Sequence, residues 1–341
     1  MFSSGRASVG ELADRRKMTA SRITKLLGLL KATEKLASGK ACVFATGSFG
    51  RQEAGPYSDL DLFIVGKKSG MPGHDDKGGS RLKRLDEILI KADLIRATRK
   101  MNIPEFSGDG RYLTYFSVHE FTKTLGTPED DVTNTFTARL LLLLESCPLL
   151  ETKVYGEVTR EVVGAYWRDY EDHKARFMPA FLANDILRLW RTFCVNYEAR
   201  TERVPKEEKA KGKLKNYKLK HSRLLTCYSA LLYLLAIYEN YQTVTPANAV
   251  AMISLTPTER LEWLLRQRNL VRAHGAVRKL LDQYERFLET TNATEEKLLA
   301  RFMDKSTSQS YISAAYTFGD LVFHALTTIG NGNQFHRLLV V

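Results

Sequence analysis

Two aspartates, Asp59 and Asp61, stand at alternate positions where an apolar run, Leu60 to Val65, begins. In a β-strand, residues two apart point to the same face, so both carboxylates leave the same side of the predicted strand. Two carboxylates held this close repel each other unless a cation lies between them, and Mg²⁺ prefers oxygen ligands of this kind. The pair therefore predicts a site for Mg²⁺ or Mn²⁺, with both aspartates as metal ligands and catalytic residues.

A glycine-rich turn precedes the aspartates. The apolar run Cys42 to Ala45 leads into the segment Gly47-Ser48-Phe49-Gly50-Arg51. Glycines let backbone N–H groups approach a phosphate chain without interference from side chains. A phosphate cradle beside a carboxylate pair is the apparatus of phosphoryl or nucleotidyl transfer. The alternative interpretation is an edge strand that carries surface aspartates after a turn.

Together the two features resemble the nucleotidyltransferase superfamily that includes DNA polymerase β, whose pattern is Gly-Ser or Gly-Gly followed by Asp-apolar-Asp. A tighter form, GSxGRxE and then SDLDL, looks most like the protein-PII uridylyltransferases and their stand-alone bacterial relatives. That form is matched by Gly47, Ser48, Gly50, Arg51, Glu53, Ser58, Asp59, Leu60, Asp61 and Leu62. The resemblance implies metal-dependent transfer of a nucleoside monophosphate from an NTP or dNTP to an acceptor hydroxyl, with release of pyrophosphate.

The resemblance also implies roles for individual residues in binding the nucleotide. Gly47 and Ser48 would hold the β- and γ-phosphates, and the aspartate pair would position the α-phosphate through one or two Mg²⁺ ions. Arg51 would either reach a phosphate or pair with Glu53 to brace the loop, and the sequence does not separate these two roles.

A third carboxylate usually follows on a later strand in this superfamily, and here its position is open. The next strand-like run, Tyr112 to Val118, contains no acid. Glu105 and Asp109 precede that run, so either of them, or no residue, would fill the third position.

A lysine-rich segment at 205–220 lies directly before an apolar helix predicted at 224–238. In related nucleotidyltransferases a helical domain contributes Lys and Ser to the triphosphate, and Lys218, Lys220 and Ser222 are the matching candidates here. A charge run is more often a solvated face or loop.

We expect an α+β protein with two domains. Residues 1–150 would form a polymerase β-like nucleotidyltransferase domain, a small mixed sheet with helices at 8–37 and 81–100, and residues 151–341 an all-helical domain. A polar segment at 67–80 predicts a surface loop beside the site. Beyond residue 151 the patterns predict helices at 156–172, 178–200, 246–253, 256–270, 273–292, 294–304 and 309–328.

The composition is that of an ordinary globular protein with excess positive charge. Of 341 residues, 44% are hydrophobic and 26% are charged, and the formal net charge is +12. This charge favours anionic partners, namely a nucleoside triphosphate, nucleic acid or an acidic protein, although surface lysines explain it without a polymer partner. The cysteines lie far apart in apolar surroundings, which favours free thiols in a reducing cytoplasm: Cys42, Cys147, Cys194 and Cys227.

No segment of the sequence predicts a membrane protein. The longest apolar stretch, Leu224 to Tyr238, falls short of the ~18–20 residues that a span needs. The first residues are charged and lack the apolar core of a signal peptide, so we expect a cytoplasmic protein. The apolar end of the chain, QFHRLLVV, predicts docking on its own domain or on a neighbouring subunit, and thus leaves a homo-oligomer or a partner subunit open.

Three functions fit these features. The first is transfer of a nucleotide to a protein or nucleic acid, and a toxin that caps transfer RNA ends would share every feature named. The second is template-independent synthesis of a nucleotide signal or oligonucleotide in bacterial antiphage defence. The third is an inactive nucleotide-sensing or partner-binding subunit, against which the intact Ser48, Asp59 and Asp61 argue.

Overall fold

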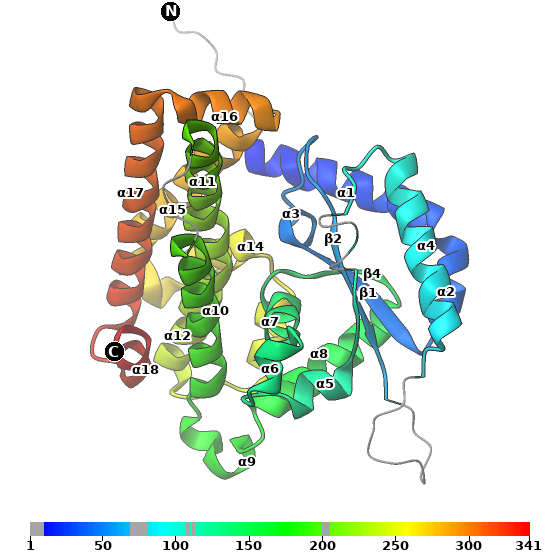
Figure 1. The fold of residues 1–341 in the computed structure, drawn as a ribbon. Helices are drawn as coiled ribbons and strands as arrows, with labels where there is room; N and C mark the ends of the chain where they lie inside the picture. Colours follow the sequence, from blue (N-terminus) through cyan, green and yellow to red (C-terminus); the bar gives the residue numbers. More distant parts are fainter. Residues whose placement is uncertain (1–9, 69–80, 107–109, 111–112, 200–204) are drawn as a thin grey trace, which may run out of the picture.

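A four-stranded mixed sheet organises the N-terminal half of the chain (Figure 1). The computed structural model describes residues 10–68, 81–106, 110, 113–199 and 205–341. The sheet has the order β3-β2-β1-β4, in which β1 runs antiparallel to β2 and β4 while β2 and β3 are parallel. Its strands are β1 (Ala41–Thr46), β2 (Asp61–Gly66), β3 (Tyr115–Ser117) and β4 (Cys147–Leu150).

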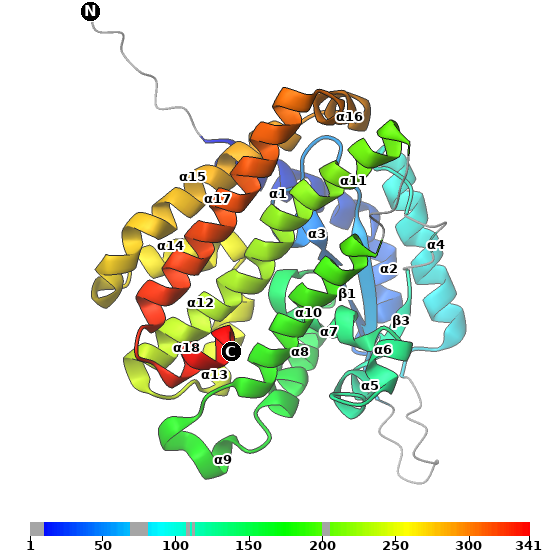
Figure 2. The same ribbon diagram turned by 60° about the vertical axis from the view of Figure 1, so that its left-hand side comes forward.

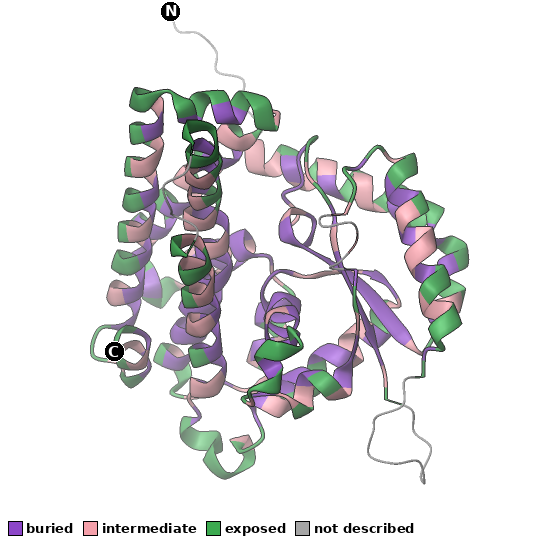
Figure 3. Ribbon diagram, viewed as in Figure 1, coloured by how far each residue is buried: buried purple, intermediate pink, exposed green. Residues whose placement is uncertain are grey.

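Both faces of the sheet are covered, and each face belongs to a different hydrophobic core. Side chains alternate along a strand, so Val43 and Ile64 point to one face while Phe44 and Phe63 point to the other. The first face packs against α1 (Glu11–Leu29), α2 (Lys31–Ala37) and α4 (Arg84–Lys100). The second face packs against helices that include α5 (Val118–Lys123), α7 (Thr135–Glu145) and α8 (Thr152–Tyr166). Figure 3 shows the resulting burial of β1 and β2.

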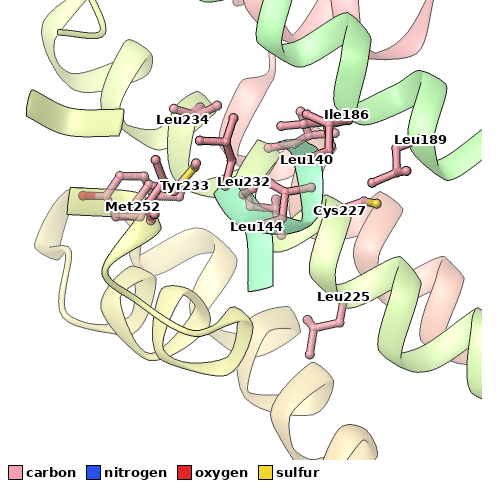
Figure 4. Packing of buried hydrophobic residues seen from close by; sticks show 14 of the residues in the cluster. Leu140, Leu144, Ile186, Leu189, Leu225, Cys227, Leu232, Tyr233, Leu234 and Met252 are labelled. Carbon is pink, nitrogen blue, oxygen red and sulfur yellow. The ribbon is translucent and has the colours of Figure 1, made fainter. Parts of the chain in front are cut away.

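The rest of the described chain is helical and packs around α12 (Leu224–Tyr241), in which every residue from Leu224 to Tyr238 except the half-buried Tyr228 is buried. Close packing of leucines from α7, α10 and α12 fills this core (Figure 4). α15 and α17 lie side by side on the outer surface (Figures 1 and 2). The remaining helices are α3 (Gly47–Gly50), α6 (Glu129–Val132), α9 (Tyr170–His173), α10 (Ala180–Glu198), α11 (Lys206–Lys218), α13 (Pro246–Ile253), α14 (Pro257–Leu265), α15 (Val271–Thr291), α16 (Glu295–Met303), α17 (Lys305–Gly330) and α18 (Gln334–Val340), with short helical turns at Lys174–Arg176, Leu219–Arg223 and Arg268–Leu270.

The helical core continues onto the sheet without a break. One hydrophobic cluster contains Phe44 and Phe63 of the sheet together with the buried residues of α12 and α17. α1 adds a second connection, because the guanidinium of Arg15 donates to the carbonyl of Leu288 on α15 at 3.0 Å. The sheet therefore separates the two hydrophobic cores, and one of these cores is shared by the sheet and the helical region. A domain boundary at residue 150 stays a prediction.

The α+β class is confirmed, and the structure corrects several expected elements. The helix expected at 8–37 is two helices that meet at Leu30, because the backbone of this residue (φ −101°, ψ 9°) departs from the helical conformation. The strand expected from residue 112 is described as β3, which begins at Tyr115, and β4 follows an apolar helix in a segment for which we expected no strand. Most of the segment 205–220 is the helix α11. The segment 69–80 lies outside the described residues.

The C-terminal helix α18 docks on the chain's own helical region, as one of the two expected alternatives. Its Phe335 is fully buried, and the ring lies 5.7 Å from that of Tyr238 on α12. Across the described ranges, none of the helices has the length and apolar character that would cross a membrane. All four cysteines are free thiols, of which Cys42 and Cys227 are buried.

A glycine substitution tests the junction between β1, α3 and α7. A Cβ atom on Gly50 would overlap the backbone carbonyl of Glu145 and lie 2.8 Å from the carbonyl oxygen of Ala45. Because backbone atoms cannot move aside cheaply, we expect Gly50→Ala to lower the free energy of unfolding by about 2–3 kcal/mol in urea denaturation.

The matched control for Gly50→Ala is Gly28→Ala in α1. A Cβ atom there meets nothing within 4 Å, so the same change should be neutral or stabilise the helix by up to ~1 kcal/mol. Equal denaturation midpoints for the two variants would contradict the close approach of α7 to α3.

Candidate active site

The glycine-rich turn and the aspartate pair meet at one edge of the sheet. Thr46 at the end of β1 pairs with Asp61 at the start of β2, which places the turn beside this aspartate. Gly47 has a φ of +63°, and a Cβ atom there would lie 2.8 Å from Oδ2 of Asp61. Glycine is therefore required for two reasons, the left-handed backbone and the approach of the carboxylate.

The two carboxylates are left without a partner. Asp59 is exposed and Asp61 is half-buried. In the described part of the chain no hydrogen bond or ion pair holds either carboxylate. Burial, followed by the negative charge of Asp59, raises the pKa of Asp61 above its usual range. A pair of oxygen ligands in uncompensated repulsion is a donor set that fits a divalent cation.

Among the residues that the structure describes, a third metal ligand is not found beside this pair. Within the described residues, no group of three or more His, Cys, Asp or Glu could hold a metal ion. β3 begins at Tyr115 opposite Ile64 and carries no acid. Glu105 is exposed and its carboxylate accepts from Arg99 at 3.0 Å, while Asp109 lies outside the described residues.

The loop residues expected at the phosphates differ in what they offer. Ser48 is half-buried, and its hydroxyl makes no hydrogen bond to another described residue. Gly47, in contrast, donates its N–H to Oε1 of Glu145 at 3.1 Å. Gly47 therefore provides space and backbone shape, while the hydroxyl of Ser48, the next residue, makes no hydrogen bond to another described residue.

Glu145, the last residue of α7, holds the glycine-rich loop through hydrogen bonds to Gly47 and Arg51. Its side chain is fully buried and accepts from four donors: the N–H of Gly47, Nη1 of Arg51 at 2.8 Å, Oγ1 of Thr226 at 2.7 Å and Nη1 of Arg223. Burial opposes its ionisation, but the charges of Arg223 and Arg51 hold the pKa of Glu145 at about 2. A single ionised carboxylate thus joins the loop to α12.

The sequence left two roles open for Arg51, and in the structure its side chain braces the loop by pairing with Glu53. Its Nε donates to Oε2 of Glu53 at 2.9 Å, and its Nη1 donates to Glu145. Burial alone would lower the pKa of Arg51, but the charges of Glu145 and Glu53 raise it. The hydroxyl of Tyr284 on α15 also donates to Oε2 of Glu53, at 2.7 Å. Arg51 therefore faces the interior and pairs with Glu53, the second of the two expected roles, and a contact of its guanidinium with a phosphate stays a prediction.

The residues expected from the helical region lie at the end of α11 and in the turn that follows. Lys218 is exposed and Lys220 is half-buried. Ser222 is buried, and its hydroxyl donates to the carbonyl of Lys218 at 2.8 Å, so it is committed to the helix. The neighbouring Arg223 is the residue of this segment that reaches the network around Glu145.

The sequence singled out Glu145 as a polar residue of an apolar helix that would face the cleft or serve in capping or surface pairing, but it did not identify the partners of Glu145 or a role for Arg223 in the site. Glu145 is separated by 94 residues from Arg51, and nothing local indicates that pairing. The available signal was its place at the end of the otherwise apolar run Leu140–Leu144, where an acid must find a buried partner.

Comparison with known proteins supports the N-terminal assignment. Residues 26–105 match the family described as Nucleotidyltransferase domain. The matched segment contains β1, α3, the aspartate pair, β2 and α4, and it ends before β3, Glu145 and Arg223. No curated protein matches the chain. The match supports a nucleotidyltransferase with a nucleotide substrate.

Removal of the Glu145 charge should make the protein less stable at neutral pH. Its pKa of about 2 lies below the ordinary 4.5, so it contributes stability above about pH 5 that is lost as the pH falls toward 2. A shift of this size corresponds to about 3 kcal/mol. We expect Glu145→Gln to lose about that amount at pH 7 and to approach the wild type as the pH falls, in urea denaturation measured at several pH values.

Glu105→Gln serves as the control, because this exposed residue forms a surface ion pair and should change stability by less than about 1 kcal/mol. A wild-type minus Glu145→Gln difference that stays constant from pH 7 to pH 3 would mean that Glu145 is not ionised in the folded protein.

Proposed function

We propose that this protein transfers a nucleoside monophosphate from an NTP or dNTP to an acceptor hydroxyl, with Asp59 and Asp61 as the catalytic metal ligands. The observation that carries the proposal is the partnerless carboxylate pair against Gly47, inside the segment that matches the nucleotidyltransferase family. A structural role for the pair would require a direct partner to relieve its repulsion, and none of the described residues forms a hydrogen bond or an ion pair with either carboxylate.

The chain's own residues would act on the triphosphate from two sides. Mg²⁺ or Mn²⁺, when bound to the pair, would neutralise charge on the α-phosphate and on the attacking and leaving oxygens. Ser48 would donate its hydroxyl to a phosphate oxygen, next to the space that Gly47 leaves. Arg51 would act indirectly, because its bonds to Glu145 and Glu53 hold the loop in this shape.

Lys218 and Lys220 are the positively charged residues of the helical region that we include among the proposed nucleotide-binding residues. Neither forms an ion pair with a described acid, so both are available to an anion. Ser222 lies beside them but is engaged with the backbone. These residues would attract the triphosphate, since a positive potential raises the local concentration of an anionic substrate.

The acceptor that we propose is a nucleic acid or a protein. Exposed lysines of α11 without an acid partner in the described part of the chain support an anionic acceptor or product: Lys206, Lys209, Lys215 and Lys218. The same surface supports the second candidate, template-independent synthesis of an oligonucleotide or nucleotide signal in antiphage defence. Both functions agree with free thiols and a cytoplasmic location.

Loss of the aspartate pair should abolish transfer. We expect purified protein with Mg²⁺ or Mn²⁺ and an α-³²P-labelled NTP or dNTP to yield labelled product on a denaturing gel. Asp59→Asn and Asp61→Asn should each lower the rate by more than about 100-fold, since each removes a charge that stabilises the transition state.

Asp172→Asn, an exposed aspartate of α9, is the matched control and should retain full activity. A labelled ladder would favour the synthase, and label on the protein or on added RNA would favour an acceptor of that class. Transfer that survives in both site variants would refute the assignment of the site, and nucleotide binding without transfer would favour the inactive sensor.

Metal binding can be measured without the acceptor. A ligand that binds only the folded state at 100 times its Kd stabilises it by about 2.7 kcal/mol. We expect Mn²⁺ to raise the Tm of the wild type and of Asp172→Asn, and EDTA to reverse the shift. The Asp59→Asn/Asp61→Asn double variant should show no shift, and an equal shift in all proteins would mean that the metal binds elsewhere.

A further inference from the structure

The chain passes from α11 into α12 through a π-helical turn, Leu219–Arg223. Such turns place an extra residue in a helix and are frequent at functional sites. This turn is fixed by His221, which is buried and stacks on the ring of Phe287 with centroids 4.7 Å apart. Nδ1 of His221 also lies 2.9 Å from the carbonyl oxygen of Tyr217. A rigid support therefore presents the last residue of the turn, Arg223.

Arg223 connects the buried network to the open side of the site. Its Nη1 contacts Glu145, its guanidinium lies 5.4 Å from the ring of Phe193, and its side chain is 28% exposed. Oε1 of Glu145 accepts from this Nη1 and also from the N–H of Gly47, where a Cβ atom would lie 2.8 Å from Oδ2 of Asp61. Arg51 is held between two buried carboxylates. Arg223 is thus the more accessible of the two arginines that contact Glu145.

Glu145 does not need Arg223 to keep its hydrogen bonds. Its Oε1 also accepts from the N–H of Gly47, and its Oε2 accepts from Arg51 and Thr226. Departure of the Arg223 guanidinium would leave both oxygens paired and one positive charge still in contact. Arg223 can therefore exchange partners without leaving a buried carboxylate uncompensated.

We propose that Arg223 binds the triphosphate of the incoming nucleotide, exchanging Glu145 for phosphate oxygens. This inference rests on the proposed function, because it requires the triphosphate to lie beside Asp61. Guanidinium groups suit the task, since their fork of donors matches phosphate oxygens and stays charged at every physiological pH. The residue would thereby couple nucleotide binding in the N-terminal half to the position of α12.

Inorganic tripolyphosphate with Mg²⁺ tests the proposal without knowledge of the base or the acceptor. We expect titration calorimetry to show binding to the wild type and 10- to 100-fold weaker binding to Arg223→Met, roughly the range for a charged hydrogen bond. Arg223→Lys should bind with intermediate affinity, because it keeps the charge and loses the fork. Arg272→Met, which removes an exposed arginine of α15, should bind like the wild type.

Two results would overturn the proposal and are distinguishable from each other. Equal affinity of the wild type and the Arg223 variants would refute the role of Arg223 and leave the proposed function standing. Absence of tripolyphosphate binding and of nucleotidyl transfer in the wild type would refute both. If Arg223→Met does not fold, as judged by its circular dichroism and Tm, Arg223→Lys decides, and its unchanged affinity would refute the proposal.

Discussion

The buried carboxylate of Glu145 is the constraint on which the geometry of the site depends. An ionised group with no exposure costs several kcal/mol unless its oxygens are paired, and here four donors pair them. The donors come from the glycine loop and from the junction of α11 and α12. Because these donors converge on one carboxylate, the shape of the loop is linked to the position of the helical region. The matched nucleotidyltransferase segment therefore depends on residues that lie outside it.

The network around Glu145 and the aspartate pair both adjoin Gly47, but their electrostatic environments are opposite. Arg51 and Arg223 compensate Glu145 within the interior, so that its pKa falls to about 2. At Asp61 burial and the charge of Asp59 raise the pKa, and no donor relieves the repulsion. The fully buried Glu145 is paired with four donors, whereas the exposed Asp59 and half-buried Asp61 have no donor among the described residues. The unpaired carboxylates lie where a cation and an anionic substrate can reach them. This contrast is what we expect of a binding site rather than of a structural ion-pair cluster.

The parts of the fold that follow local patterns were predictable from the sequence. The apolar run that becomes β2 and the periodic helices after residue 151 depend on neighbours in the chain, and the structure has them. Because β2 begins at Asp61, Asp59 precedes the strand on which we expected both aspartates. Contacts between distant segments were not predictable, because no local pattern encodes the partner of Glu145 or the stacking that fixes the π-helical turn. The strand β4 was missed because four residues after an apolar helix read as its continuation.

The most direct test is a crystal of the protein with Mn²⁺ and a non-hydrolysable NTP analogue, measured for the anomalous scattering of manganese. The account predicts a manganese peak in contact with both Asp59 and Asp61, and a triphosphate within hydrogen-bond distance of Ser48. Manganese and nucleotide bound elsewhere, with the two aspartates in contact with solvent or protein donors alone, would contradict it.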